Sequence, residues 1–276
     1  MLSSNGTVLG IDVGCSAQRR SSAVCRLDWD ARKVIWRVDR FRALEPERSS
    51  AIAAMAGNVR LACAAFDGPL RRGFKVIGRY RTAERMLTRR LRPRIGKPGA
   101  SNVPVGMLLN AHANACAIAV LRHCDVALAT HATRIDDKAV VEAFPSSFLG
   151  VLIDDPSMLA ARRHNRSDLF FLHCCERGIF DRLIDHLLPR RTLVQCPDAL
   201  TDHDERAAFV CGLTALCVAA DDHTAVGDHD GWIILPPYAL VQPWAKDDLE
   251  ANAAAEALRS PCGGLSAFST AGRPGV

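Results

Sequence analysis

Hydrophobic residues near the start of the chain fall into three runs that predict extended strands. The runs cover residues 7–14 (TVLGIDVG), 21–30 (SSAVCRLDWD) and 34–41 (VIWRVDRF). In the third run Val34, Trp36 and Val38 fall on one face, while Arg37 and Asp39 fall on the other. Because short turns separate the runs, we expect an antiparallel meander.

The rest of the chain mixes helical periodicity with short apolar runs. Residues 47–57, 82–92, 106–123 and 203–220 have the spacing of helices, and residues 150–200 predict a helical insertion. Residues 59–66 and 139–143 are apolar without interruption, which is typical of strands buried on both faces. A last short strand is expected over residues 231–236. We expect a single domain over residues 1–245 and a C-terminal tail over residues 246–276, rich in Ala, Gly, Ser and Pro, that is partly disordered.

Three of the apolar runs carry an isolated acid at or near their end: Asp12, Asp67 and Glu142. A carboxylate at the end of a buried strand is costly to desolvate unless a cation or a hydrogen-bond donor accompanies it. We therefore expect the strand ends to meet around a shared divalent cation, as in many phosphoryl-transfer sites. Each acid also has a structural explanation. Asp12 can terminate its strand, Asp67 can belong to an ordinary Asp-Gly-Pro turn, and Glu142 can pair with an arginine.

Charge is distributed unevenly along the chain. The net charge is +5, but residues 71–97 hold eleven Lys or Arg against a single acid, Glu84, so the remainder is negative. Such a local surplus favours a docking surface for a polyanion. On a helix over 82–92, Arg81, Arg85, Arg89 and Arg92 would share one face, and we expect them to bind the phosphates of a nucleic acid. The structural alternative is a solvated face that pairs with acids elsewhere.

Cysteine usage and hydropathy limit the class of protein. The eleven cysteines contain no CxxC pair, which indicates free thiols in a reducing compartment. Zinc binding by His173, Cys174 and Cys175 is poorly supported, because adjacent residues rarely chelate one ion. We see no signal peptide, and the longest apolar stretch, 207–220, is too short to span a membrane. We expect a cytoplasmic protein with no membrane partner.

Several segments in series resemble those of a known family. VLGIDVG, FDGPL, RTAERML, VVEAFP and HDERAAFVCGLTA occur in the order found in uncharacterised bacterial and archaeal proteins described as predicted RNase H-like nucleases. The resemblance covers roughly residues 6–240. It implies an α/β protein with the RNase H-like fold. The fold would have a mixed five-stranded sheet, three antiparallel strands followed by two parallel ones, with helices on both faces and residues 150–200 as a helical insertion.

The resemblance also implies site residues and cofactors. Asp12, Asp67, Glu142 and Asp204 would be the catalytic acids and would hold two divalent ions, Mg²⁺ or Mn²⁺. One ion would activate the attacking water and the other would stabilise the leaving oxygen. Glu142 matches the family's Glu-x-x-Pro motif. Asp204 would point back at the metals from the last helix, although it could also be only the helix N-cap.

One position departs from the family pattern. Similar proteins, and the related Holliday-junction resolvases, often carry a second acid three residues after the first on the last helix, and Ala207 stands there in this chain. Asp202 or Glu205 could substitute, although at their spacing neither shares the face of Asp204. His203 could move protons, or be a surface histidine.

Three functions are compatible with these features. The leading hypothesis is a metal-dependent nuclease or phosphodiester hydrolase acting on nucleic acid. The second is a small actin-like kinase or ATPase, because GIDVG followed by Cys15 and Ser16 resembles a first phosphate loop. No second phosphate loop or adenosine motif accompanies it. The third is a catalytically decayed nucleic-acid-binding protein, for which Ala207 is the main argument.

Overall fold

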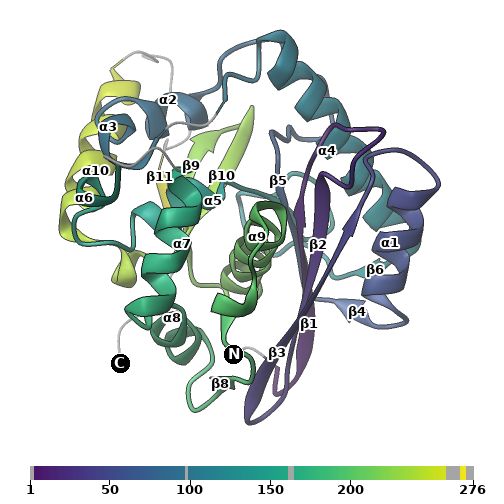
Figure 1. Cartoon of the computed structure of the whole chain (residues 1–276). Helices are drawn as coiled ribbons and strands as arrows, with labels where there is room; N and C mark the ends of the chain where they lie inside the picture. Colours follow the sequence, from purple (N-terminus) through teal and green to yellow (C-terminus); the bar gives the residue numbers. More distant parts are fainter. Residues whose placement is uncertain (1–2, 97–98, 161–164, 259–267, 272–276) are drawn as a thin grey trace.

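The computed structural model describes residues 3–96, 99–160, 165–258 and 268–271. In these residues the chain is an α/β protein built on a mixed nine-stranded sheet, with helices on both faces (Figure 1). The order across the sheet is β11-β9-β10-β7-β5-β1-β2-β3-β8. The strands are β1 (Gly6–Asp12), β2 (Ser22–Trp29), β3 (Lys33–Phe41), β5 (Cys63–Asp67), β7 (Val140–Ala143), β8 (Thr192–Leu193), β9 (His223–Asp228), β10 (Gly231–Leu235) and β11 (Phe268–Ala271). A separate pair consists of β4 (Arg60–Leu61) and β6 (Asp125–Val126).

The five expected strands form the centre of this sheet. β1 is antiparallel to β2, and β2 is antiparallel to β3. On its other side β1 is parallel to β5, which is parallel to β7. These directions confirm the prediction of three antiparallel strands followed by two parallel ones. The strand expected over residues 231–236 is present as β10, which pairs with β7. The predicted five-stranded sheet is too small, because β10 continues the sheet through β9 and β11, while β8 pairs with β3.

One helix crosses the centre of the sheet and another pair covers its opposite face. α9 (His203–Ala219) packs on β1, β2 and β5, while α1 (Glu47–Ala56) and α4 (Pro104–His123) lie on the other side (Figure 1). Gly10 permits the close approach of α9. A Cβ added there would lie 2.0 Å from the Gly212 nitrogen and 2.3 Å from the Ala208 carbonyl oxygen. The backbone of α9 therefore rests directly on β1.

The helix expected over residues 82–92 is in fact two short helices. α2 (Thr82–Thr88) ends at Arg89, whose φ and ψ of −42° and −105° are not helical, and α3 (Arg92–Ile95) begins one residue before Pro93. Pro93 has no backbone N–H, and inside a continuous helix its ring would clash with the carbonyl of Arg89, four residues earlier, where α2 ends. The four arginines therefore do not share the face of a single helix.

The region around residues 150–200 is largely helical, as predicted. It contains α6 (Ser157–Ala160), α7 (Arg166–Glu176) and α8 (Ile179–Leu187), and it follows α5 (Pro145–Gly150). Three phenylalanines connect it to the core. Phe171 and Phe180 pack against each other at a tilt, and each packs edge-on against Phe209 of α9.

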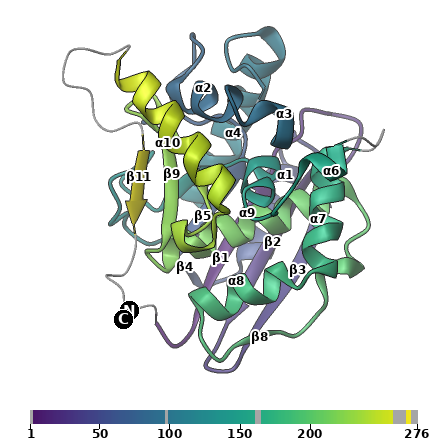
Figure 2. The same cartoon turned by 90° about the vertical axis from the view of Figure 1, so that its left-hand side faces the viewer.

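The segment expected to be a tail contains a helix that the sequence analysis missed. α10 (Pro243–Ala257) buries Leu249, Asn252 and Glu256, and it packs on α2 (Figure 2). Its alanine content favours a helix rather than an unstructured chain. Of the last dozen residues, only 268–271 are described, and they form β11 at the edge of the sheet.

By length and composition, α4 is the one described helix that could cross a membrane, and 44% of the qualifying window is buried in the molecule. The helix also packs on α1 and β5, as a core helix does.

Candidate functional site

Two of the predicted acids lie directly opposite each other at the carboxyl ends of parallel strands. Asp12 is the last residue of β1, and its partner in the β1–β5 register is Asp67, the last residue of β5. Residues that are directly opposite in a sheet point to the same face. Gly10, two residues before Asp12, lies against α9, so both carboxylates belong to the face that α9 covers.

The start of α9 adds Asp202 and Asp204 to the same end of the sheet. Asp202 is the N-cap, because its side chain accepts a hydrogen bond from the Asp204 backbone nitrogen at 2.9 Å. The alternative that Asp204 is the helix N-cap is therefore wrong. Asp204 lies one turn before Ala208, which contacts Gly10, and its charge raises the pKa of Asp12.

Burial and neighbouring acids disfavour the ionised form of Asp12 and Asp67. Burial is the largest cause that raises the pKa of Asp12 well above its ordinary value, followed by the charges of Asp67, Asp204 and Asp202. Burial also raises the pKa of Asp67 to about 7, with a further contribution from Glu142 and an opposing one from His203. Neither carboxylate has a hydrogen-bond or ion-pair partner among the described residues. A proton or a cation is needed to stabilise such a pair.

Arg40 is a site residue that the sequence analysis missed. It donates from Nη1 to Asp202 at 2.8 Å and from Nη2 to Asp204 at 2.6 Å. Arg40 continues the face of β3 on which Val34, Trp36 and Val38 lie. An arginine at the end of an inward-facing series needs an acid, and that signal could have identified it.

Glu142, which is predicted as a metal ligand, lies on the opposite face of the sheet from Asp12 and Asp67 and pairs with an arginine. Its neighbours on the adjacent strands are Phe66 and Ile233, whereas Asp67 is opposite the next residue, Ala143. Because side chains alternate between the two faces of a sheet, Glu142 points to the face opposite that of Asp67. Arg81 donates to both of its carboxylate oxygens at 2.7 Å, and the Leu70 backbone nitrogen donates to one of them at 2.7 Å. Glu142 and Arg81 are both buried. The arginine salt bridge, which was the structural alternative, is what the structure contains.

The basic segment is also paired more extensively than its sequence indicates. Arg85 and Arg89 both bind Glu256 of α10, the former at 2.8 Å, and Arg81 binds Glu142 and Glu84. Arg71 and Arg79 both bind Asp230. Of the four arginines predicted to contact nucleic acid, Arg92 is exposed, whereas Arg81 is buried and the other two are about one-quarter to one-third exposed. The exposed basic side chains without an ion-pair partner among the described residues of this segment are Arg72, Lys75, Arg90 and Arg92.

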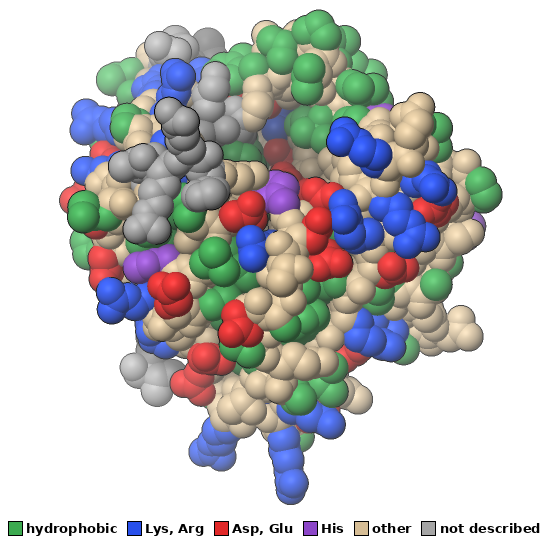
Figure 3. Space-filling model, viewed as in Figure 1, with side chains coloured by type: hydrophobic (Ala, Val, Ile, Leu, Met, Phe, Trp, Pro, Cys, Tyr) green, Lys and Arg blue, Asp and Glu red, His purple; other side chains and the backbone are tan. Residues whose placement is uncertain are grey.

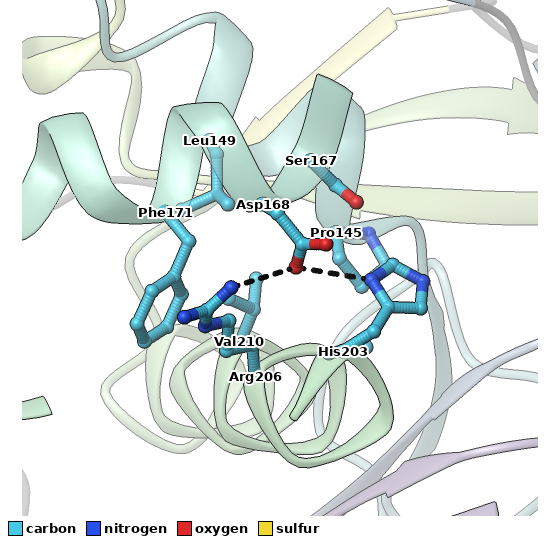
Figure 4. Close-up of a pocket in the computed structure, with 9 residues that line it drawn as sticks. Pro145, Leu149, Ser167, Asp168, Phe171, His203, Arg206 and Val210 are labelled. Atoms are coloured by element: carbon cyan, nitrogen blue, oxygen red, sulfur yellow. Dashed lines mark hydrogen bonds and ion pairs between the residues drawn. The ribbon is translucent and has the colours of Figure 1, made fainter. Parts of the chain in front are cut away.

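A small pocket lies beside the start of α9 (Figure 4). Asp168 of α7 accepts from His203 Nδ1 at 3.1 Å and from Arg206 Nη1 at 3.2 Å, which fixes the histidine ring at the pocket rim. Ala207, where the family pattern has its second acid, lines the same pocket and is 5% exposed. His203 is 45% exposed, and its charge opposes the burial that raises the pKa of Asp67.

The surface is hollowed at this end of the sheet. Figure 3 shows acidic side chains gathered around a depression, with Lys and Arg side chains on either side of it. A cavity there is lined by Asp67, Arg81 and Glu142 together with Leu109 of α4 and the backbone around Gly99 and Gly106. A ligand can thus reach Asp67 from solvent.

Within the described ranges, no three His, Cys, Asp or Glu side chains are grouped as a ready-made metal site, and this includes His173, Cys174 and Cys175 on α7. The donor chemistry of Asp12 and Asp67 nevertheless fits a hard divalent cation, because both are unpaired carboxylates. The ten described cysteines are free thiols, as expected, and six of them are buried.

No family model, curated protein or solved structure matches this chain.

Proposed function

We propose that the protein is a metal-dependent phosphodiester hydrolase that acts on nucleic acid and has an RNase H-like core. The proposal rests on Asp12 and Asp67, which lie opposite each other on neighbouring parallel strands. Neither carboxylate has an ion-pair partner among the described residues. The order of strands and the closing helix α9 agree with the RNase H-like arrangement that the sequence resemblance implies.

Asp12 and Asp67 would hold the divalent ion, Mg²⁺ or Mn²⁺, with Asp204 within reach at the start of α9. The ion would supply Lewis-acid activation of water and of the phosphate. The protein's own residues orient the reaction around it. α9 is fixed on β1 at Gly10, which sets the distance between Asp204 and Asp12.

His203 is suited to transfer a proton at this site. Its Nδ1 lies 3.1 Å from Asp168, and Asn165 Nδ2 lies 3.1–3.2 Å from both ring nitrogens, so these two residues set the ring orientation. An imidazole can carry a proton to a leaving oxygen or take one from water. Exposed Arg90 and Arg92 would contact the phosphate backbone without reading bases.

The kinase or ATPase alternative lacks a free phosphate loop. In the β1–β2 connection the Gly14 nitrogen donates to Ser22 Oγ at 3.0 Å and the Ser16 nitrogen to Ser21 Oγ at 3.1 Å. The nitrogens of Gln18 and Arg19 both donate to Ser16 Oγ. These amides are already satisfied within the loop, whereas a phosphate loop presents them to its ligand.

Cleavage of labelled RNA, single-stranded DNA and branched DNA with Mg²⁺ or Mn²⁺ tests the proposal. We expect metal-dependent cleavage that falls at least about 100-fold in Asp12→Asn and Asp67→Asn, in line with the loss of a metal-held charge in the transition state. Asp125→Asn is the matched control, because that side chain is 66% exposed and belongs to β6. Cleavage that is equal in wild type and Asp12→Asn would overturn the proposal. Binding without cleavage would select the decayed protein, and stabilisation by MgATP would select the kinase.

A further inference from the structure

We propose that the Arg40 guanidinium supplies the second positive charge of the acidic site, in place of a second divalent ion. The site would then bind one metal ion per chain rather than two. This inference rests on the proposed function, since it concerns the same carboxylates. It replaces the two-ion expectation for this chain.

The sheet register places Arg40 where a second cation would be needed. Asp12 is opposite Ala23 on β2, and Ala23 is opposite Arg40 on β3. Arg40 therefore shares the row and the face of Asp12 and Asp67. The small side chain of Ala23 stands between Arg40 and Asp12, which leaves room for the guanidinium to extend over it toward α9.

The contacts of Arg40 fix it at the start of α9. One Nη donates to Asp202 and the other to Asp204, so two helix residues hold a planar group from two sides. The second nitrogen also donates to the Arg20 carbonyl oxygen. Asp202 is itself fixed, because its other oxygen caps α9. The guanidinium is thus built into the end of the helix rather than free on the surface.

Charge accounting then separates the four carboxylates into two pairs. Asp202 and Asp204 share Arg40, while Asp12 and Asp67 have no ion-pair partner among the described residues. The two unpaired carboxylates carry the charge that one divalent ion neutralises. Ala207 agrees with this division, because the acid that would help to hold a second ion is absent from α9.

Counting bound Mn²⁺ tests the inference without any activity measurement. The metal-free protein is titrated with Mn²⁺, and free ion is followed by electron paramagnetic resonance, for wild type, Arg40→Gln, Arg40→Lys and Arg37→Gln. Arg37 is the matched control, because it lies on the same strand, is 59% exposed and pairs with Asp28 at 3.4 Å. We expect one ion per chain for wild type, Arg40→Lys and Arg37→Gln. For Arg40→Gln we expect a second, weaker ion, together with a lower melting temperature that Mn²⁺ restores.

Two ions in the wild type, or the same count in wild type and Arg40→Gln, would overturn the inference. If Arg40→Gln does not fold, the number of ions bound by the wild type still decides the question. Two bound ions would mean that Arg40 does not take the place of the second ion. No Mn²⁺ binding by the wild type would instead show that the proposed metal-dependent function is wrong, so the two failures are distinguishable.

Discussion

Replacing Asp67 by asparagine should stabilise the metal-free protein at neutral pH. The wild-type site holds two half-buried carboxylates without a cation among the described residues, and the pKa of Asp67 is raised from its ordinary value of 3.8 to about 7 by burial, with Glu142 adding to the effect. A carboxyl group with a raised folded-state pKa binds its proton more tightly in the folded state. Stability is therefore highest below the unfolded pKa and is lost as pH rises from about 4 through 7.

The size of the effect follows from that interval. About three pH units at ~1.4 kcal/mol each give a ceiling of about 4 kcal/mol, and solvent screening of a half-buried group reduces it to roughly 2–4 kcal/mol. Asp67→Asn removes the ionisable group and with it this loss of stability at high pH. At pH 8 in EDTA the variant should therefore be more stable than wild type by that amount. At pH 4 the two proteins should be nearly equal.

Urea unfolding at pH 4, 6 and 8, with EDTA or with Mg²⁺, measures this difference. Mg²⁺ at pH 8 should stabilise wild type and leave Asp67→Asn unchanged, since binding to the folded state alone adds stability. Asp125→Asn controls for the general removal of an exposed acid. A stability difference between wild type and Asp67→Asn that is constant from pH 4 to pH 8 would refute the argument that burial raises the pKa of Asp67.

Three further predictions concern the supports of the site. Gly10→Ala should lower the free energy of unfolding by about 2–3 kcal/mol and weaken Mn²⁺ binding, because the added Cβ would lie 2.0 Å from the α9 backbone. Urea unfolding and a Mn²⁺ titration check this, and unchanged stability would contradict it. Glu142→Gln should lower the free energy of unfolding in urea by roughly 3 kcal/mol, because it breaks a buried ion pair, and it should leave Mn²⁺ affinity unchanged. Weaker Mn²⁺ binding would indicate that Glu142 is a metal ligand. Charge reversal of Arg90 and Arg92 together should weaken polynucleotide binding and reduce its salt dependence in a gel-shift assay, whereas reversal of Arg60, on β4, should not; equal effects would rule out a docking surface at α3.

The centre of the fold was predictable because its strands have a plain hydrophobic signature. β1, β5 and β7 are buried on both faces, so their apolar runs are unbroken and their positions are clear from the sequence. β9 was missed because HTAVGD mixes polar and apolar residues and becomes a strand only by pairing with β10 and β11. α10 was missed because an alanine-rich composition was interpreted as low complexity.

The site was predictable only as far as strand ends determine it. Asp12 and Asp67 each end a parallel strand, and such ends meet at one edge of the sheet. The face on which Glu142 lies could not be predicted, because the side-chain direction alternates with every residue and the register that pairs it with Phe66 depends on the folded sheet. The partner of Arg85 and Arg89 is Glu256, more than 160 residues away, so local charge counts could not identify it.

Binding of Mn²⁺ to wild type, Asp12→Asn and Asp67→Asn tests the central claim most directly. Titration followed by electron paramagnetic resonance should show Mn²⁺ bound to the wild type, and binding weakened at least tenfold by either substitution, because each removes one of two ligand carboxylates. Equal Mn²⁺ affinity in all three proteins would contradict the assignment of these strand-end acids to a cation site.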